Sequence, residues 1–255
     1  MHTVNLTCPT SWRELSQQQL RYVFYLLATF ADLTVVKTYM FVRFTGIRVI
    51  RRNRFGWQCA KGGQVFYIQL WQIHSFIQQL DWVGSYETMD NRLDVVQGLH
   101  AVDPLLQLNP DTGRYVPFDD YLYMEAQYQH FHNSRDEAHI DRLASFLYRR
   151  PDYSRVSELS LTPAECLATI AWYAHVKLVM AAAFPHFFRK AKADADTADL
   201  SILESYNVQL RALTDGDVTK EHAVKQLDCW RALTELDAKA REAEEFRRKF
   251  PKAAQ

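Results

Sequence analysis

Helix-start signals recur along this chain, and they constrain its fold more than any other feature. In a capping box, a serine or threonine and a glutamate or glutamine three residues later satisfy backbone N–H groups that the first helical turn leaves unpaired. This spacing occurs at 16–19, at 134–137 and at 162–165, where Pro163 also favours a helix start. Glycine accounts for 8 of the 255 residues, about half of average usage. The sequence therefore predicts a mainly α-helical fold with few tight turns.

Apolar periodicity and the cap signals place the expected helices along the chain. Their approximate ranges are 16–30, 33–44 (closed by Gly46), 70–82, 118–132, 134–150, 162 to a point before Pro185, 200–213, and 220–250. We expect these helices to form bundle-like lobes.

One segment near 47–69 has the period of a β-structure instead. Apolar residues alternate there with polar or basic ones, at Ile47, Val49, Trp57, Cys59, Val65 and Tyr67. Glycines punctuate the alternation, which predicts a small antiparallel hairpin or three-stranded meander. Residues 84–116 are rich in turn signals and read as an irregular linker or arm. The predicted organisation is thus an N-terminal lobe over 1–83, a linker over 84–116 and a C-terminal lobe over 117–255.

The charges of this neutral chain are divided along its length. Lysine plus arginine and aspartate plus glutamate each number 30. Residues 33–80 carry seven basic side chains and no acidic one, whereas residues 81–141 carry twelve acids against three arginines. The two segments either pair with each other or recognise other proteins, because complementary charges set partner choice and register. Contact between copies of the chain, head to tail, is a further alternative that the pattern leaves open.

Aromatic rings are interleaved with the cations of the basic segment. Nucleic-acid binders use this mixture, since cations contact phosphates and rings stack on bases, and an acidic protein would also fit it. A neutral net charge argues against a dedicated nucleic-acid binder, which is usually basic. Internal pairing with the acids of 81–141 is the plainest alternative. The candidate partner-binding residues of this segment are Arg43, Arg48, Arg51, Arg52, Arg54 and Trp57.

The last helix changes character along its length. Its first half carries an apolar stripe that includes Trp230, Leu233 and Leu236, and its second half is mostly charged. Phe246 and Phe250 lie four residues apart in that charged half and would share one face. We expect the helix to dock by its first half and to project by its second, so Phe246 and Phe250 complete the candidate partner-binding set.

No catalytic, cofactor-binding or metal-binding signature is present in the sequence. There is no nucleophile elbow, phosphate-binding glycine loop or Cys-x-x-Cys pair. Glu125, His130, His132 and His139 cluster in the sequence, but their spacing does not fit metal ligation on one helix. We therefore predict no enzyme, no cofactor and no metal. The alternative is a hydrolase whose site assembles in space, which requires a pocket that joins His130 or His139 to a nucleophile.

The sequence is typical of a cytoplasmic protein without a membrane span. The start of the chain lacks a basic region followed by an apolar run, so we expect no signal peptide. The two most apolar stretches, 23–36 and 170–184, are interrupted by Asp32 and by His175 and Lys177. Neither reaches the roughly 18 unbroken apolar residues of a membrane helix. The four separated cysteines fit buried free thiols in a reducing compartment.

Two stretches resemble a pattern in bacteriophage and prophage proteins of the Bacteroidota type. The stretch 117–125 reads Pro-Phe-Asp-Asp-Tyr-Leu-Tyr-Met-Glu, and 141–151 reads Asp-Arg-Leu-Ala-Ser-Phe-Leu-Tyr-Arg-Arg-Pro. In that pattern, an aromatic-acidic helix start precedes a helix that ends in a Leu-Tyr-Arg-Pro-like tetrad. The opening Pro9-Thr-Ser-Trp12, with Glu14-Leu15 and Gln19-Leu20, is similar to the start of the same proteins. Here the tetrad has an extra arginine, and the basic hairpin lies outside the pattern.

The resemblance covers the chain up to Pro151 and implies a role beside tail or baseplate assembly chaperones and small virion structural proteins. Its motifs are structural, and we expect Tyr148 to be a core or cap residue. The resemblance therefore implies a non-enzymatic protein of the host cytoplasm or the virion. Its partners would be other phage or assembly proteins, or further copies of itself, and the nucleic-acid-associated protein remains the first alternative.

Overall fold

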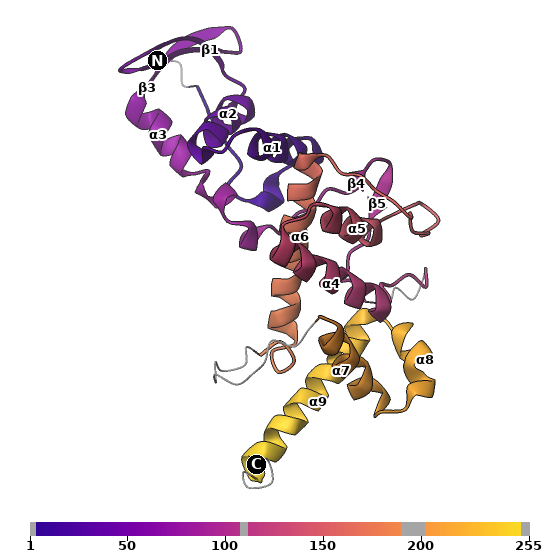
Figure 1. Ribbon diagram of the computed structural model, residues 1–255. Helices are drawn as coiled ribbons and strands as arrows, with labels where there is room; N and C mark the ends of the chain where they lie inside the picture. Colours follow the sequence, from indigo (N-terminus) through magenta and orange to yellow (C-terminus); the bar gives the residue numbers. More distant parts are fainter. Residues whose placement is uncertain (1–3, 108–111, 190–201, 251–255) are drawn as a thin grey trace. The chain divides into compact units, whose positions relative to one another are not determined.

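The computed structural model describes residues 4–107, 112–189 and 202–250 (Figure 1). Backbone contacts divide the chain into two compact units. The N-terminal unit comprises Met1–Asp94 and Leu161–His175, and the C-terminal unit comprises Val95–Ser160 and Val176–Gln255. The helix α6 (Pro163–Ala183) contributes to both units. The described part of the chain is predominantly helical and contains two small antiparallel sheets.

The first two long helices of the N-terminal unit follow the predicted ranges, whereas the third ends at 78 and not at the predicted 82. The unit contains the 3-10 helix η1 (Trp12–Glu14), α1 (Gln17–Thr29), α2 (Leu33–Thr45) and α3 (Leu70–Gln78). The capping box of Ser16 and Gln19 is confirmed, because each side chain accepts a hydrogen bond from the other's backbone N–H. Helix α2 ends at Gly46, whose φ of 68° is the left-handed conformation that favours glycine.

A three-stranded meander follows α2, as the alternation predicts. Strands β1 (Arg48–Asn53), β2 (Gly56–Lys61) and β3 (Gln64–Gln69) pair in the order β1-β2-β3. The β1–β2 register shifts between Val49 and Arg51. Trp57, Cys59 and Ile68 face the core and are buried. Arg51, Gln58 and Tyr67 oppose one another on the other face.

The sequence assigned the wrong phase to β3. Val65 and Tyr67 are exposed by 60% and 46%, while Ile68 is buried. Residues 65–68 are all apolar, so both phases of a strand have hydrophobic side chains and periodicity alone does not choose between them. The pairing of Trp57 with Ile68 settles the phase and leaves two large apolar side chains in solvent.

The region predicted as an irregular linker is partly ordered. After α3 come the 3-10 helices η2 (Asp81–Gly84) and η3 (Tyr86–Thr88), then β4 (Val95–Val96) and β5 (Leu99–Ala101). These strands form a second sheet with β6 (Tyr148–Arg149), in the order β4-β5-β6. The strands have two or three residues each, which is too short for a period to show in the sequence.

The predicted capping box at Ser134 is wrong. Helix α4 (Phe118–Ser134) continues through this residue, and the Ser134 hydroxyl donates to the His130 carbonyl within α4. Helix α5 (Ala138–Leu147) starts four residues later, and its first N–H is bonded to the Asp136 carboxylate. The helix also ends before the predicted 150, because Tyr148 and Arg149 join the second sheet.

The remaining helices follow the prediction except at one break. The capping box of Thr162 and Glu165 opens α6. Helix α7 (Ile202–Thr214) is followed by the 3-10 helix η4 (Val218–Lys220). The helix expected over 220–250 is instead divided into α8 (Glu221–Lys225) and α9 (Cys229–Lys249). Asp228 caps α9, because its carboxylate accepts a hydrogen bond from the Trp230 N–H at 2.8 Å. This cap starts a new helix within a segment whose continuous apolar stripe had indicated a single one.

The sequence stretches 117–125 and 141–151 meet in the core of the C-terminal unit. Asp120, at the start of α4, is 1% exposed. Its carboxylate lies 2.5 Å from an Arg149 nitrogen and 2.9 Å from an Arg155 nitrogen. Tyr148 is fully buried, which confirms its expected core position. The stretches 117–125 and 141–151 are therefore joined by a buried ion pair between Asp120 and Arg149.

Helix α6 is the one helix among the described residues that is long and apolar enough to cross a membrane. Of its most apolar stretch, 44% is buried inside the structure. The core helix of a soluble protein satisfies the same description, so α6 is compatible with a soluble chain. The apolar stretch 170–184 alone is shorter than a membrane helix, whereas the whole helix begins at Pro163 and has 21 residues.

Candidate partner-binding site

The five candidate arginines remain exposed and without a carboxylate partner in the part of the chain that the structure describes. These are Arg43, Arg48, Arg51, Arg52 and Arg54. Three of the acids that follow the basic segment pair elsewhere: Asp81 with Lys37 at 2.5 Å, Asp90 with Arg13 at 3.2 Å, and Asp94 with Arg92 at 3.8 Å. Internal pairing, the plainest alternative, is therefore absent for these arginines in the described residues.

Several of these arginines rest on aromatic rings instead. The Arg52 guanidinium lies 4.4 Å from the centre of the Trp57 ring, and Arg54 lies 4.7 Å from that of Phe55. Such contacts stabilise a cation by about 0.5–1 kcal/mol at an exposed site and restrict its side chain without neutralising its charge. Trp57 itself is 8% exposed, so it supports Arg52 from the core and does not present its own ring. Arg43 lies apart, on α2, near Tyr22 of α1.

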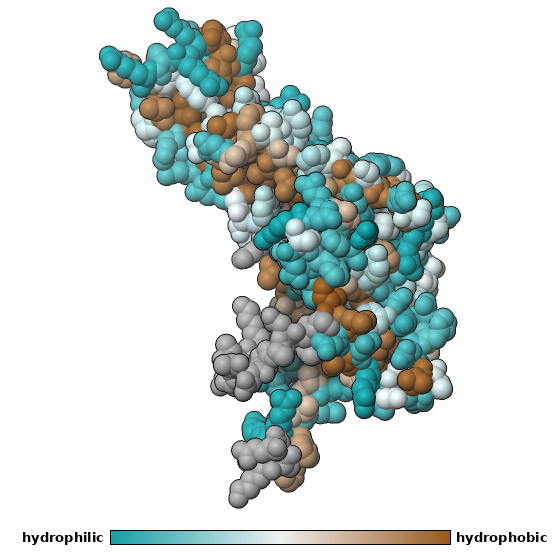
Figure 2. All heavy atoms as spheres, in the orientation of Figure 1, coloured by the Kyte–Doolittle hydropathy of each residue, from teal (hydrophilic) through white to brown (hydrophobic). Residues whose placement is uncertain are grey.

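The solvent face of the meander combines cations with uncharged side chains. One row across the strands contains Arg51, Gln58 and Tyr67, and the next contains Arg48, Ala60 and Val65. Figure 2 shows hydrophobic residues in brown beside hydrophilic ones in teal over this part of the N-terminal unit. We call the exposed side chains of this region the basic–aromatic face: Arg48, Arg51, Arg54, Phe55, Val65, Tyr67, Leu70 and Trp71.

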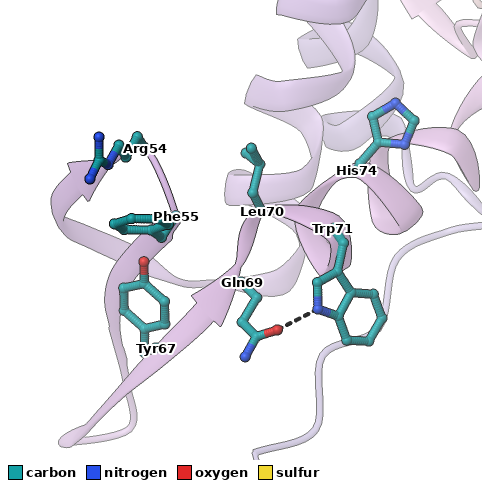
Figure 3. Close-up of a pocket in the computed structure, with 7 residues that line it drawn as sticks. All are labelled: Arg54, Phe55, Tyr67, Gln69, Leu70, Trp71 and His74. Atoms are coloured by element: carbon teal, nitrogen blue, oxygen red, sulfur yellow. Dashed lines mark hydrogen bonds between the residues drawn. The ribbon is translucent and has the colours of Figure 1, made fainter.

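A groove lies at one end of the basic–aromatic face, between the β1–β2 turn and the start of α3 (Figure 3). Its volume is about 700 Å³, and its lining is mainly apolar. Phe55 and Tyr67 line it from the meander, and Leu70 and Trp71 line it from α3. Phe55 and Trp71 are exposed by 63% and 66%. Among the described residues that line it, Arg54 and His74 are the basic side chains, and none is acidic.

Asn53 holds the two rings of the meander in position. Its side-chain oxygen accepts from the backbone N–H of Phe55 at 2.8 Å and of Gly56 at 3.1 Å. The Tyr67 hydroxyl donates to the same oxygen at 2.8 Å. These three hydrogen bonds to one oxygen hold the β1–β2 turn against β3. The Phe55 and Tyr67 rings are therefore positioned in the absence of a partner.

Two further contacts join the turn to α3. The Leu70 N–H donates to the Phe55 carbonyl at 2.9 Å, and the indole N–H of Trp71 is hydrogen-bonded to the Gln69 side chain. Gly56 permits the close approach, because a Cβ at this residue would lie 2.1 Å from the Ile68 carbonyl oxygen. The two walls of the groove, the β1–β2 turn and the start of α3, are consequently both held by backbone hydrogen bonds. Preorganisation of this kind lowers the entropy lost on binding.

Sequence reasoning missed the α3 wall of the groove. Tyr67 was counted in the apolar alternation of the segment near 47–69, and Leu70 lies three residues before Ile73, within the apolar period of the helix expected at 70–82. Trp71 carried the usable signal. It falls off the stripe of Ile73 and Ile77, so a large apolar ring on the polar side of a helix was visible in the sequence.

The second candidate surface has the expected exposure pattern. Leu233 and Leu236 in the first half of α9 are buried, while Phe246 and Phe250 are exposed by 55% and 53%. The two phenylalanine rings lie 5.0 Å apart and contact each other. The two rings therefore form an exposed aromatic pair on the charged half of α9.

The hydrolase alternative requires His130 or His139 beside a nucleophile in the described part of the C-terminal unit. His130 and His139 stack at 5.1 Å, but no metal-binding group of three is found among the described residues. A cavity lined by His130, Tyr206 and Lys225 has no serine, threonine or cysteine among its lining residues. Burial raises the pKa of the Cys229 thiol far above its ordinary value, which keeps the sulfur protonated and unreactive.

Comparison with protein-family models, curated proteins and solved structures gives no match.

Proposed function

We propose that this chain is a non-enzymatic assembly protein of the phage type that acts by protein–protein contacts through the basic–aromatic face. The carrying observation is that its three arginines, Arg48, Arg51 and Arg54, are exposed and have no carboxylate partner among the described residues, and that Arg54 lies over the Phe55 ring. Exposed, desolvatable aromatic and arginine side chains dominate binding energy at protein interfaces. The tail or baseplate role comes from the sequence resemblance, and the site of action is the cytoplasm of the bacterial host or the virion.

The experiment is complementation in a host that carries the phage with this gene deleted. The wild-type chain should restore tailed particles, counted by electron microscopy and plaque titre. The double variant Arg51→Glu with Arg54→Glu should not. The matched control, Arg231→Glu with Arg241→Glu, makes the same charge change at exposed positions of α9 and should restore assembly. Normal particles from the deletion, or equal rescue by both variants, would reject the proposal.

The mass of the purified protein across a salt series separates two versions of this role. A structural component that repeats in the particle should form salt-sensitive rings or polymers through heterologous contacts between copies. A chaperone that holds a different chain should remain a monomer at every salt concentration.

A nucleic-acid-associated protein is the second candidate, and the exposed rings beside cations favour it. Bases stack on rings of this kind, while the cations contact the backbone. The test is retention of single-stranded DNA and RNA at low salt. Retention that is salt-sensitive and lost on charge reversal at Arg51, Arg52 and Arg54 supports this candidate, and no retention at low salt rejects it.

A further inference from the structure

We infer that the groove between the β1–β2 turn and α3 binds a short acidic peptide segment of a partner protein by one large apolar side chain, with Arg54 pairing the peptide's carboxylate. This inference rests on the proposed function and names the chemistry of the partner. The groove belongs to the N-terminal unit alone.

The shape and lining of the groove specify an apolar anchor. Four large apolar or aromatic side chains, Phe55, Tyr67, Leu70 and Trp71, stand around the space (Figure 3). Each is exposed by between 46% and 66%, which costs free energy that a buried apolar group from a partner would recover. Because the backbone behind them is hydrogen-bonded, the walls do not need to rearrange.

The charge of the groove specifies a carboxylate close to that anchor. Arg54 lies at the rim, stacked on Phe55, and has no acid partner among the described residues. A guanidinium that lies over a ring keeps its charge, and its planar set of N–H donors matches the two oxygens of a carboxylate. The absence of acids from the lining means that an acidic segment meets no like charge there.

The same lining disfavours a nucleic-acid strand in this groove. A strand carries one phosphate per nucleotide and needs cations in series along its path. The groove offers Arg54, with His74 on the far wall, against four uncharged apolar side chains. One cation beside one apolar space matches a peptide that has an acid next to a bulky residue.

The first experiment is unbiased selection from a display library of random peptides. The library is selected on the full wild-type chain and, in parallel, on the Trp71→Ala and Arg54→Glu variants. On wild type, enriched peptides should carry an aromatic or large aliphatic residue within a turn of aspartate or glutamate. This enrichment should vanish on both variants. Enrichment of basic or unpatterned peptides, or the same peptides from all three proteins, overturns the inference.

The second experiment measures affinity by fluorescence anisotropy with the most enriched peptide and with oligo-dT. Trp71→Ala and Arg54→Glu should each weaken the peptide by at least about tenfold, as expected for aromatic and arginine hot spots. The controls Tyr25→Ala and Arg231→Glu remove an equally exposed ring and charge elsewhere, and should not change affinity. Tighter binding of oligo-dT, lost in Arg54→Glu, would overturn the peptide inference in favour of nucleic acid.

The outcomes remain separable from those of the proposed function. If the groove binds no peptide, and the Trp71→Ala chain still restores tailed particles, then the groove inference fails while the assembly role stands. If the gene deletion has no effect on particles but the groove selects acidic peptides, the assembly role fails and the groove stands.

Discussion

Replacement of Asp120 by alanine should strongly destabilise the C-terminal unit, because it strands a buried cation. Arg149 has a side chain that is 5% exposed, and its guanidinium lies 4.5 Å from the centre of the Tyr153 ring. Without the carboxylate it keeps a weak contact from Nε to the Phe146 carbonyl at 3.4 Å. Breaking a buried pair from one side costs about 3–5 kcal/mol. Because Arg155 is 48% exposed, water can solvate it, and its loss of the same carboxylate adds little.

Most of this loss of stability comes from the unpaired buried cation and not from the attraction within the ion pair. A double variant tests this distinction. Burial raises the pKa of the Asp120 carboxyl above its ordinary value, although Arg155 and Arg149 act in the opposite direction. The desolvation penalty therefore offsets much of the attraction between the charges. Replacing both partners, as in Asp120→Ala with Arg149→Met, removes the stranded cation and should recover at least half of the loss.

The assays are urea unfolding for the free energy and thermal unfolding for Tm, both followed by far-ultraviolet circular dichroism. In a chain of this size, each kcal/mol lowers Tm by about 2–4 °C, so Asp120→Ala should lower it by roughly 6–20 °C. The neighbouring Asp119→Ala removes one hydrogen bond from Tyr206 and should cost about 0.5–1.5 kcal/mol. The reasoning is refuted if Asp120→Ala costs no more than Asp119→Ala, or if the double variant is no more stable than Asp120→Ala.

Three further predictions address other parts of the chain. Gly56→Ala should destabilise the N-terminal unit by about 1–3 kcal/mol, typical of overpacking, and weaken any groove ligand, because its Cβ would overlap the Ile68 carbonyl; urea unfolding and anisotropy measure both. Burial raises the pKa of the Cys8 thiol to about 11 and that of Cys229 further, so neither should react appreciably with a thiol reagent at pH 8 until urea unfolds the chain. Hydrogen bonds from Arg189 and His186 lower the pKa of Glu244, so its contribution to stability is present above the usual value of 4.5 and is lost as the pH falls through the lower folded-state value; Glu244→Gln should flatten the decline of Tm in that range.

The sequence predicted those elements whose signals are local and unopposed. The caps at Ser16 and Thr162 and the glycine at 46 are satisfied within one turn, so the surrounding fold does not alter them. The signal at Ser134 failed because the serine hydroxyl has a second local acceptor, the His130 carbonyl, and α4 continued past it.

The other elements depend on pairing between residues that are far apart in the chain. The sequence alone does not show which residues pair. Tyr148 and Arg149 read as the end of a helix, but they pair with β5 far away in the chain. The phase of β3 likewise depends on Trp57 opposite Ile68. The arginines of the candidate site were identifiable from charge. The groove beside Arg54 was not, because it forms only where the turn that contains Asn53 meets the start of α3.

The order of the meander has a consequence for how the purified protein behaves. Strand β3 is an edge strand whose six residues carry no charge, a composition typical of segments that stack into cross-β fibres. The opposite edge, β1, carries three arginines, and these repel other copies over a distance of about 10 Å at 0.1 M salt. Added salt shortens that distance. Solubility should accordingly fall as ionic strength rises, and concentrated stocks should keep longest in dilute buffer.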